Sequence, residues 1–168
     1  QEWKSLSTIT FNLVDIVIKG GVYLLNTGPT SDGVIPKPTQ EVFLGVGKWL
    51  RINGESIYGA GPTPFGYEFG NEIQGKKDKR GNPAFDIKKE LRFTTKLGKL
   101  YVHIFNWPNG TLEITGLKDK VNNAYFLADP DKKPLTVSQT GENTKLTLPD
   151  QAPDTIDSVV CLELNDNQ

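Results

Sequence analysis

The sequence predicts an α/β segment followed by an all-β domain, an antiparallel β-sandwich. Before residue 60, apolar residues recur every three or four positions in two stretches, which is the spacing of one face of a helix. From about Phe85 onward, short alternations of apolar and polar residues, separated by turn residues, predict strands instead. We therefore expect an α/β segment at residues 1–60, a connection at 61–88 and the sandwich at 89–168.

The α/β segment is predicted to run helix, strand, helix. Residues 5–19 form the first expected helix, whose apolar side chains at helical spacing are Leu6, Ile9, Leu13 and Ile16. Gly20 ends it, because glycine accepts the left-handed conformation of a helix exit. Residues 22–26 are apolar on both faces and predict a short strand of a covered parallel sheet. A second helix is expected after Pro38, with Thr39 as its cap.

A single strand that is apolar on both faces cannot form a domain by itself. It needs neighbouring strands to satisfy its backbone amides and carbonyls, and no strand precedes it here. We therefore expect its partner strands to come from another segment or chain. The absence of methionine, including an initiator, also indicates that the chain does not begin at a natural translation start.

The all-β domain is predicted from seven short alternating segments separated by turn signals such as Leu97-Gly98 and Pro108-Asn109-Gly110. Strands at this spacing are typical of an antiparallel sandwich. The expected strands are residues 91–95, 99–105, 111–114, 123–127, 135–139, 144–148 and 158–164. The connection before them is rich in glycine and charge and has room for one ragged strand. Its basic run at 76–80 is expected at the tip of a solvated loop.

Composition excludes several classes of function. The 19 basic and 20 acidic residues nearly balance, which argues against a protein that neutralises the phosphates of duplex nucleic acid. No apolar run approaches the roughly 18 residues that span a bilayer. No cluster of histidine and cysteine and no acidic calcium loop suggests a metal, and nothing suggests a cofactor. Cys161 and His103, each the only one of its type, lie in alternating strands, and we expect structural roles for both.

Three stretches carry a family resemblance: residues 12–36 (NLVDIVIKGGVYLLNTGPTSDGVIP), 45–58 (GVGKWLRINGESIY) and 100–108 (LYVHIFNWP). Together they resemble the α-L-fucosidases of glycoside hydrolase family 29. The resemblance is strong over residues 3–59, clear near 91–108 and only architectural beyond.

The resemblance implies that the α/β segment is the last helix–strand–helix of a (β/α)8-like TIM barrel, with its active site at the C-terminal ends of the strands. It implies a retaining, exo-acting enzyme that removes terminal α-L-fucosyl residues from fucosylated glycans through a fucosyl-enzyme intermediate. The nucleophilic aspartate of the family lies upstream of the matched region, so an N-terminal barrel segment is an expected partner. A periplasmic or secreted location is a further expectation from the family.

Five residues are candidates for the site that the resemblance implies. Glu2 falls near the position of the family's acid/base, although it can equally be a solvated terminal residue. Val22 and Tyr23 begin the strand that lines the sugar pocket in the family; alternation lets only one of the two face the barrel interior, and ordinary core packing is the alternative. Asn26 can reach the site or cap the following turn. Trp3 can touch the group to which the fucose is attached.

Two other functions stay open at this stage. The chain can be a noncatalytic piece whose sandwich binds carbohydrate or supports the barrel. The absence of a concentrated aromatic cluster in the sandwich disfavours sugar binding, although Tyr101, Tyr125 and Phe126 leave it open. An interaction module unrelated to sugars is the weakest alternative.

Overall fold

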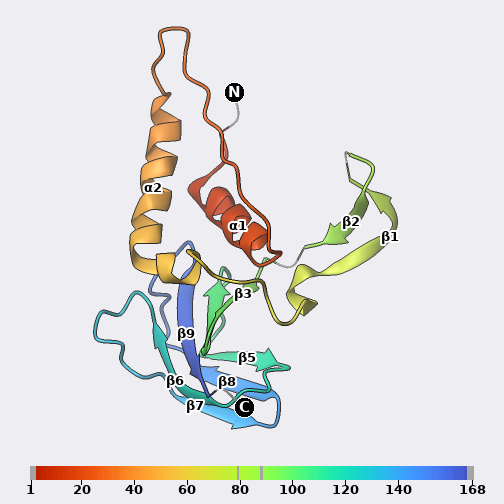
Figure 1. Cartoon of the computed structure of the whole chain (residues 1–168), viewed down its shortest axis with the longest axis vertical. Helices are drawn as coiled ribbons and strands as arrows, with labels where there is room; N and C mark the ends of the chain where they lie inside the picture. Colours follow the sequence, from red (N-terminus) through yellow and green to blue (C-terminus); the bar gives the residue numbers. More distant parts are fainter. Residues whose placement is uncertain (1–2, 79, 88, 166–168) are drawn as a thin grey trace.

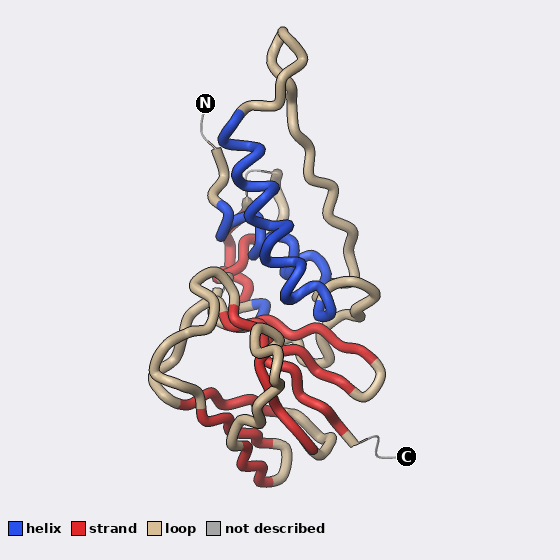
Figure 2. The backbone as a smooth tube through the Cα atoms, turned by 90° about the vertical axis from the view of Figure 1, so that its left-hand side faces the viewer, coloured by secondary structure: helices blue, strands red, loops and turns tan. Residues whose placement is uncertain are grey.

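Two helices and a long loop stand above a β-sandwich, and a hairpin projects to one side (Figure 1). The structure is a computed structural model that describes residues 3–78, 80–87 and 89–165. Helices α1 (Leu6–Val17) and α2 (Lys37–Asn53) are followed by two short 3-10 turns, η1 (Gly54–Ser56) and η2 (Tyr67–Phe69). The long loop between the helices runs beside α2 over much of its length (Figure 2).

The helix ends follow from local chemistry. The Ser5 side chain accepts a hydrogen bond from the Thr8 amide and caps α1. Gly20, with φ of 70°, turns the chain out of the helix as predicted. The predicted cap of α2 is wrong, because the helix begins at Lys37 and Thr39 lies inside it. Pro38 suits that first turn, since the amide that proline lacks has no partner there.

The strand predicted at residues 22–26 is not a hydrogen-bonded strand in this structure. The chain there is without regular secondary structure, and Val22 and Leu24 are 94% and 84% exposed. The physical reason is that a strand is defined by its neighbours, and no described segment lies against either edge of this one.

A two-stranded antiparallel hairpin occupies most of the predicted connection. Its strands are β1 (Asn71–Lys77) and β2 (Pro83–Asp86), where the sequence suggested one ragged strand. The basic stretch lies at its tip, where the Asp78 carboxylate accepts hydrogen bonds from the amides of Arg80 and Asn82. The hairpin is pinned at its base by Gly70, where an added Cβ would lie 1.8 Å from the Asp86 carbonyl oxygen.

The sandwich consists of a four-stranded and a three-stranded antiparallel sheet, and the predicted strands agree with the observed ones to within two residues at each end. The larger sheet has the order β3-β4-β9-β6, and the smaller has the order β5-β8-β7. The bounds are β3 (Leu91–Lys96), β4 (Lys99–Ile104), β5 (Thr111–Thr115), β6 (Val121–Phe126), β7 (Val137–Thr140), β8 (Asn143–Thr147) and β9 (Ser158–Leu164).

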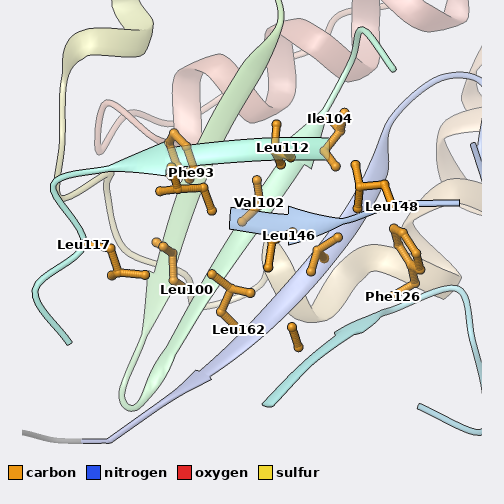
Figure 3. Close-up of a cluster of buried hydrophobic side chains, with 13 residues drawn as sticks. Phe93, Leu100, Val102, Ile104, Leu112, Leu117, Phe126, Leu146, Leu148 and Leu162 are labelled. Atoms are coloured by element: carbon orange, nitrogen blue, oxygen red, sulfur yellow. The ribbon is translucent and has the colours of Figure 1, made fainter. Parts of the chain in front are cut away.

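The two sheets enclose the main hydrophobic core, which Figure 3 shows. Alternate residues of the larger sheet, such as Phe93, Val102 and Leu162, face alternate residues of the smaller one, such as Ile114 and Leu146. This packing confirms the predicted β-sandwich. The barrel of which the helices would be a part is not seen in this chain.

A second core joins the helices to the outer face of the larger sheet. Its buried members are Val14, Ile18, Trp49, Ile57, Tyr101, Tyr125, Val159 and Cys161. Val14 of α1, Trp49 of α2 and Ile57, just after η1, all belong to this core. The sandwich therefore holds the helices in place.

Candidate functional site

The candidate site is the stretch between the helices that has no strand partner, residues 22–29, here called the open segment. None of these residues forms a backbone hydrogen bond with another described residue; the amides of Gly21 and Thr30, on either side, bond back to the Ile16 and Val34 carbonyls. The helix exit at Gly20 and the turn after Thr30 therefore fix both ends of a chain whose own amides and carbonyls are left for a partner.

Exposure alternates along the open segment. Tyr23, Leu25 and Thr27 are half-buried, whereas Val22, Leu24 and Asn26 are exposed. This two-residue period is that of a β-strand with one face against the helices and one face uncovered. In this structure Tyr23 is half-buried on the helix side, and Val22 lies on the uncovered face. Which of the two faces a barrel interior stays a prediction.

A cavity of about 410 Å³ lies on the helix side of the open segment. Residues of the open segment from Tyr23 to Gly28 form one wall, and the start of α2, with Pro38, Thr39 and Val42, forms another. Trp3 borders the cavity as well. The cavity thus extends along the helix side of the segment to its C-terminal end, the end at which β/α proteins place their ligands.

The five predicted site residues separate into groups. Trp3 and Tyr23 are brought together at the cavity, and Asn26 also borders it while remaining exposed. Val22 lies on the uncovered face of the segment. So does the 84% exposed side chain of Leu24, a residue that also borders the cavity and that the sequence analysis did not select. The signal for Leu24 was available, since it follows Val22 by two residues in a predicted strand. Glu2 lies outside the described residues.

Two acids near the helices, Asp15 and Glu55, make contacts that join the helices to the sandwich. Asp15 on α1 receives a hydrogen bond from Arg92 Nε at 2.8 Å and one from Lys19 Nζ at 2.6 Å. Arg92 itself is fully buried, and its Nη1 donates to the Glu68 and Leu91 carbonyls at 2.8 and 2.7 Å. This arrangement couples α1 to β3, which is a structural role for the Asp15 carboxylate.

Glu55 on η1 makes a similar connection to β4. It accepts hydrogen bonds from Lys99 Nζ at 2.7 Å and from the Tyr101 hydroxyl at 2.8 Å. The Lys99 ammonium lowers the pKa of the Glu55 carboxyl, while burial raises the pKa of the Tyr101 hydroxyl. Burial also raises the pKa of the Cys161 thiol, which is fully buried as expected and is not an activated nucleophile.

Among the residues that the structure describes, no three or more histidine, cysteine, aspartate or glutamate side chains are grouped so that they can hold a metal ion. Within the same residues, no helix is both long and apolar enough to cross a membrane.

The geometry defines two helices, joined by the open segment, that pack on a β-sandwich, and comparison with known proteins makes this more specific. The alpha-L-fucosidase family profile matches residues 1–55. Tissue alpha-L-fucosidase of Mus musculus is 39% identical over 107 residues, 63% of this chain and 20% of its own length. Alpha-L-fucosidase of Dictyostelium discoideum is 31% identical over 160 residues, 90% of this chain and 31% of its own length.

The same relationship holds in three dimensions. The structure of alpha-L-fucosidase isoenzyme 1 from Paenibacillus thiaminolyticus superposes with a TM-score of 0.77 at 30% identity, over 99% of this chain and 36% of that one. The recognition made from the sequence is confirmed: this chain is a homologue of the α-L-fucosidases, which are glycoside hydrolases. It spans about a fifth to a third of the length of the relatives that it matches.

Proposed function

We propose that this chain is the C-terminal portion of a retaining, exo-acting α-L-fucosidase, in which the open segment is the closing strand of a catalytic (β/α) barrel. The nucleophile and most of the sugar pocket then come from an N-terminal barrel segment. In the complete site, a carboxylate attacks the anomeric carbon and displaces the aglycone oxygen, which a second carboxyl group protonates. That second group then removes a proton from the water that releases fucose.

The open segment is the observation that carries the proposal. Its alternating faces, its unpaired backbone and the helices on one side of it are those of a barrel strand that lacks its two neighbours. The uncovered apolar side chains of Val22 and Leu24 suit the packed interior of a barrel, which branched aliphatic residues fill. The chain spans only about a fifth to a third of its relatives' length, which supports a separate N-terminal segment that carries the rest of the barrel.

Reconstitution tests the proposal directly. The chain is assayed for hydrolysis of an aryl α-L-fucoside alone and then with a separately expressed N-terminal barrel segment of about 250 residues. We expect no activity from the chain alone and activity from the mixture. Activity of the chain alone would contradict the external nucleophile, and an inactive mixture that forms a stable complex would favour a noncatalytic, supporting role.

A matched pair of variants shows whether the open segment makes the contact. Leu24→Asp places a charge on the uncovered face, where we expect at least a hundredfold loss of reconstituted activity because the charge would be buried. Leu97→Asp is the control, since Leu97 is equally exposed, at 92%, but lies in the β3–β4 turn of the sandwich. Equal activities for the two variants would rule out the open segment as the docking strand.

Glu2 is the proposed acid/base within the reconstituted enzyme. Glu2→Gln removes the proton needed by a poor leaving group but not by a good one. We therefore expect a much larger loss with a fucosyl glycan than with a nitrophenyl fucoside whose leaving group needs no protonation. The same fractional loss with both substrates would mean that Glu2 is a solvated terminal residue and that the acid/base lies elsewhere.

A further inference from the structure

A buried polar cluster lies where the end of α2 meets the sandwich. His103 on β4 and Asp157, just before β9, are both fully buried, and His103 Nδ1 lies 2.7 Å from Asp157 Oδ2. On the other side of the ring, His103 Nε2 lies 3.2 Å from Thr94 Oγ1. The Trp49 indole of α2 donates its N–H to the Asp157 carbonyl at 3.0 Å and lies beside the His103 ring, with 6.2 Å between centroids.

The hydrogen bonds fix where the protons are. Thr94 Oγ1 donates its only hydrogen to the Ser56 carbonyl at 2.7 Å, so towards His103 it can only accept. Nε2 of His103 must therefore carry a hydrogen. The short contact between Nδ1 and the Asp157 carboxyl then holds one further proton, either on the imidazole or on the carboxyl, and in both arrangements the pair has no net charge.

We propose that His103 and Asp157 form a shared-proton latch, which ties helix α2 to the sandwich while the proton is present and loosens when it is lost. Removal of the shared proton leaves a buried negative charge and sets the Nδ1 lone pair against the carboxylate oxygens. The ring can then donate a hydrogen bond to the carboxylate only if its remaining proton moves from Nε2 to Nδ1. That move breaks the hydrogen bond from Nε2 to Thr94. Trp49 reports and transmits the change, because its indole is bonded to the backbone of Asp157.

The surroundings favour the uncharged pair. Burial raises the pKa of the Asp157 carboxyl, opposed by His103, and the charge of Asp154 raises it further. Arg92, the cross-strand neighbour of His103, is already paired with Asp15. On the same face of the sheet, burial raises the pKa values of Tyr101 and Cys161, which therefore add no charge near neutral pH.

Proton counting gives the sign of the pH dependence. An unfolded chain loses the imidazolium proton near pH 6.5 and the aspartic acid proton near pH 4. Between about pH 4 and pH 6.5 the pair holds one titrating proton in both the folded and the unfolded chain. The pair therefore adds no pH dependence to the free energy of unfolding in this range. Above about pH 6.5 the unfolded pair has lost this proton. While the shared proton stays in the folded latch, the folding equilibrium constant therefore falls about tenfold per pH unit. Below about pH 4 the unfolded pair holds one proton more than the folded pair, so the free energy of unfolding falls as the pH decreases.

Asp157→Asn separates the latch from ordinary packing. The amide can donate to Nδ1, so the Nε2–H bond to Thr94 is kept, but no proton is shared. The folded imidazole is then neutral, and its contribution reverses: flat above about pH 6.5 and falling below it. We expect the urea-unfolding profile of the 168-residue chain to fall with rising pH above about 6.5, and the profile of its D157N variant to stay flat there and to fall with decreasing pH below it. Asp150→Asn, at an exposed position, is the control and should keep the original profile.

A second measurement needs no variant. His103 is the only histidine, so histidine-selective ¹⁵N labelling yields one imidazole spectrum. We expect Nε2 to be protonated throughout pH 5 to 8. An unprotonated Nε2 would overturn the proposal, as would parallel pH profiles for the chain and D157N.

Discussion

At the scale of single residues, the junction between helices and sandwich depends on buried charge that is fully engaged. Arg92 has no solvent exposure, yet its guanidinium contacts a carboxylate, two carbonyls and the face of Phe11, whose centroid lies 4.9 Å from Cζ. A lysine offers one compact ammonium in place of this planar fork, so it cannot serve all these partners at once. The identity of residue 92 therefore matters more than its charge.

Arg92→Lys is expected to lower the free energy of unfolding by about 3 kcal/mol, because Asp15 and the carbonyls lose their donors in a buried site. Urea denaturation measures it. Lys145→Met is the comparison, since the pair of Lys145 with Glu113, at 3.0 Å, is exposed and such pairs contribute about 0 to 1 kcal/mol. Equal effects for the two substitutions would show that Arg92 is not a structural anchor.

At the scale of elements, the projecting hairpin depends on one close backbone approach. Every residue of β1 is exposed, and an isolated two-stranded hairpin is marginally stable in water. Its attachment to the body therefore relies on its base, where Gly70, with φ of 86°, lies against the Asp86 carbonyl.

Gly70→Ala is expected to detach or rearrange the hairpin, since its Cβ cannot coexist with the Asp86 oxygen at 1.8 Å. Gly75→Ala is the control: its φ of 74° is also positive and costs an alanine about 1 kcal/mol or more, but nothing lies within 4 Å of the added atom. Cross-strand contacts between β1 and β2, measured by NMR, should disappear in the first variant and persist in the second. Their persistence in both would mean that the approach at Gly70 is not required.

The elements differ in how far the sequence could predict them. The sandwich strands were predicted closely because each carries its own alternation, as in residues 158–164. Only one ragged strand was expected where the hairpin β1–β2 lies, because a largely exposed strand has no apolar period to detect. Residues 22–26 show the alternating exposure of the predicted strand but form no strand hydrogen bonds, because those bonds need neighbouring strands. The contact between His103 and Asp157 joins positions 54 residues apart, which no local pattern can reveal.

At the scale of the whole molecule, the sandwich is a platform that holds two helices in register for a partner. Each helix has its own attachment, α1 through Asp15 and Arg92, and α2 through Trp49 and Asp157. Both attachments lie on the outer face of one sheet, so the helices and the sheet form a single packed unit. The open segment connects the two helices and forms no backbone hydrogen bonds with other described residues.

Hydrogen exchange tests this arrangement. In the chain alone, we expect the amides of residues 22–27 to exchange nearly as fast as those of an unfolded peptide, because none is bonded to another described residue. In the reconstituted complex, they should become protected by the neighbouring strands. Amides of β4 and β9 serve as controls, protected in both states. Unchanged exchange of the open segment in an active complex would contradict its role as a barrel strand.

The separate attachment of the two helices also determines what a break in the backbone would do. An extended chain without backbone hydrogen bonds is the form of substrate that a protease accepts most readily, and the open segment offers eight such residues, 22–29, of which five are exposed. A cut there severs the only covalent link between α1 and α2, yet each helix keeps its own contacts with the sandwich. We therefore expect the nicked protein to stay in one piece, which makes this segment a natural place to divide or permute the polypeptide.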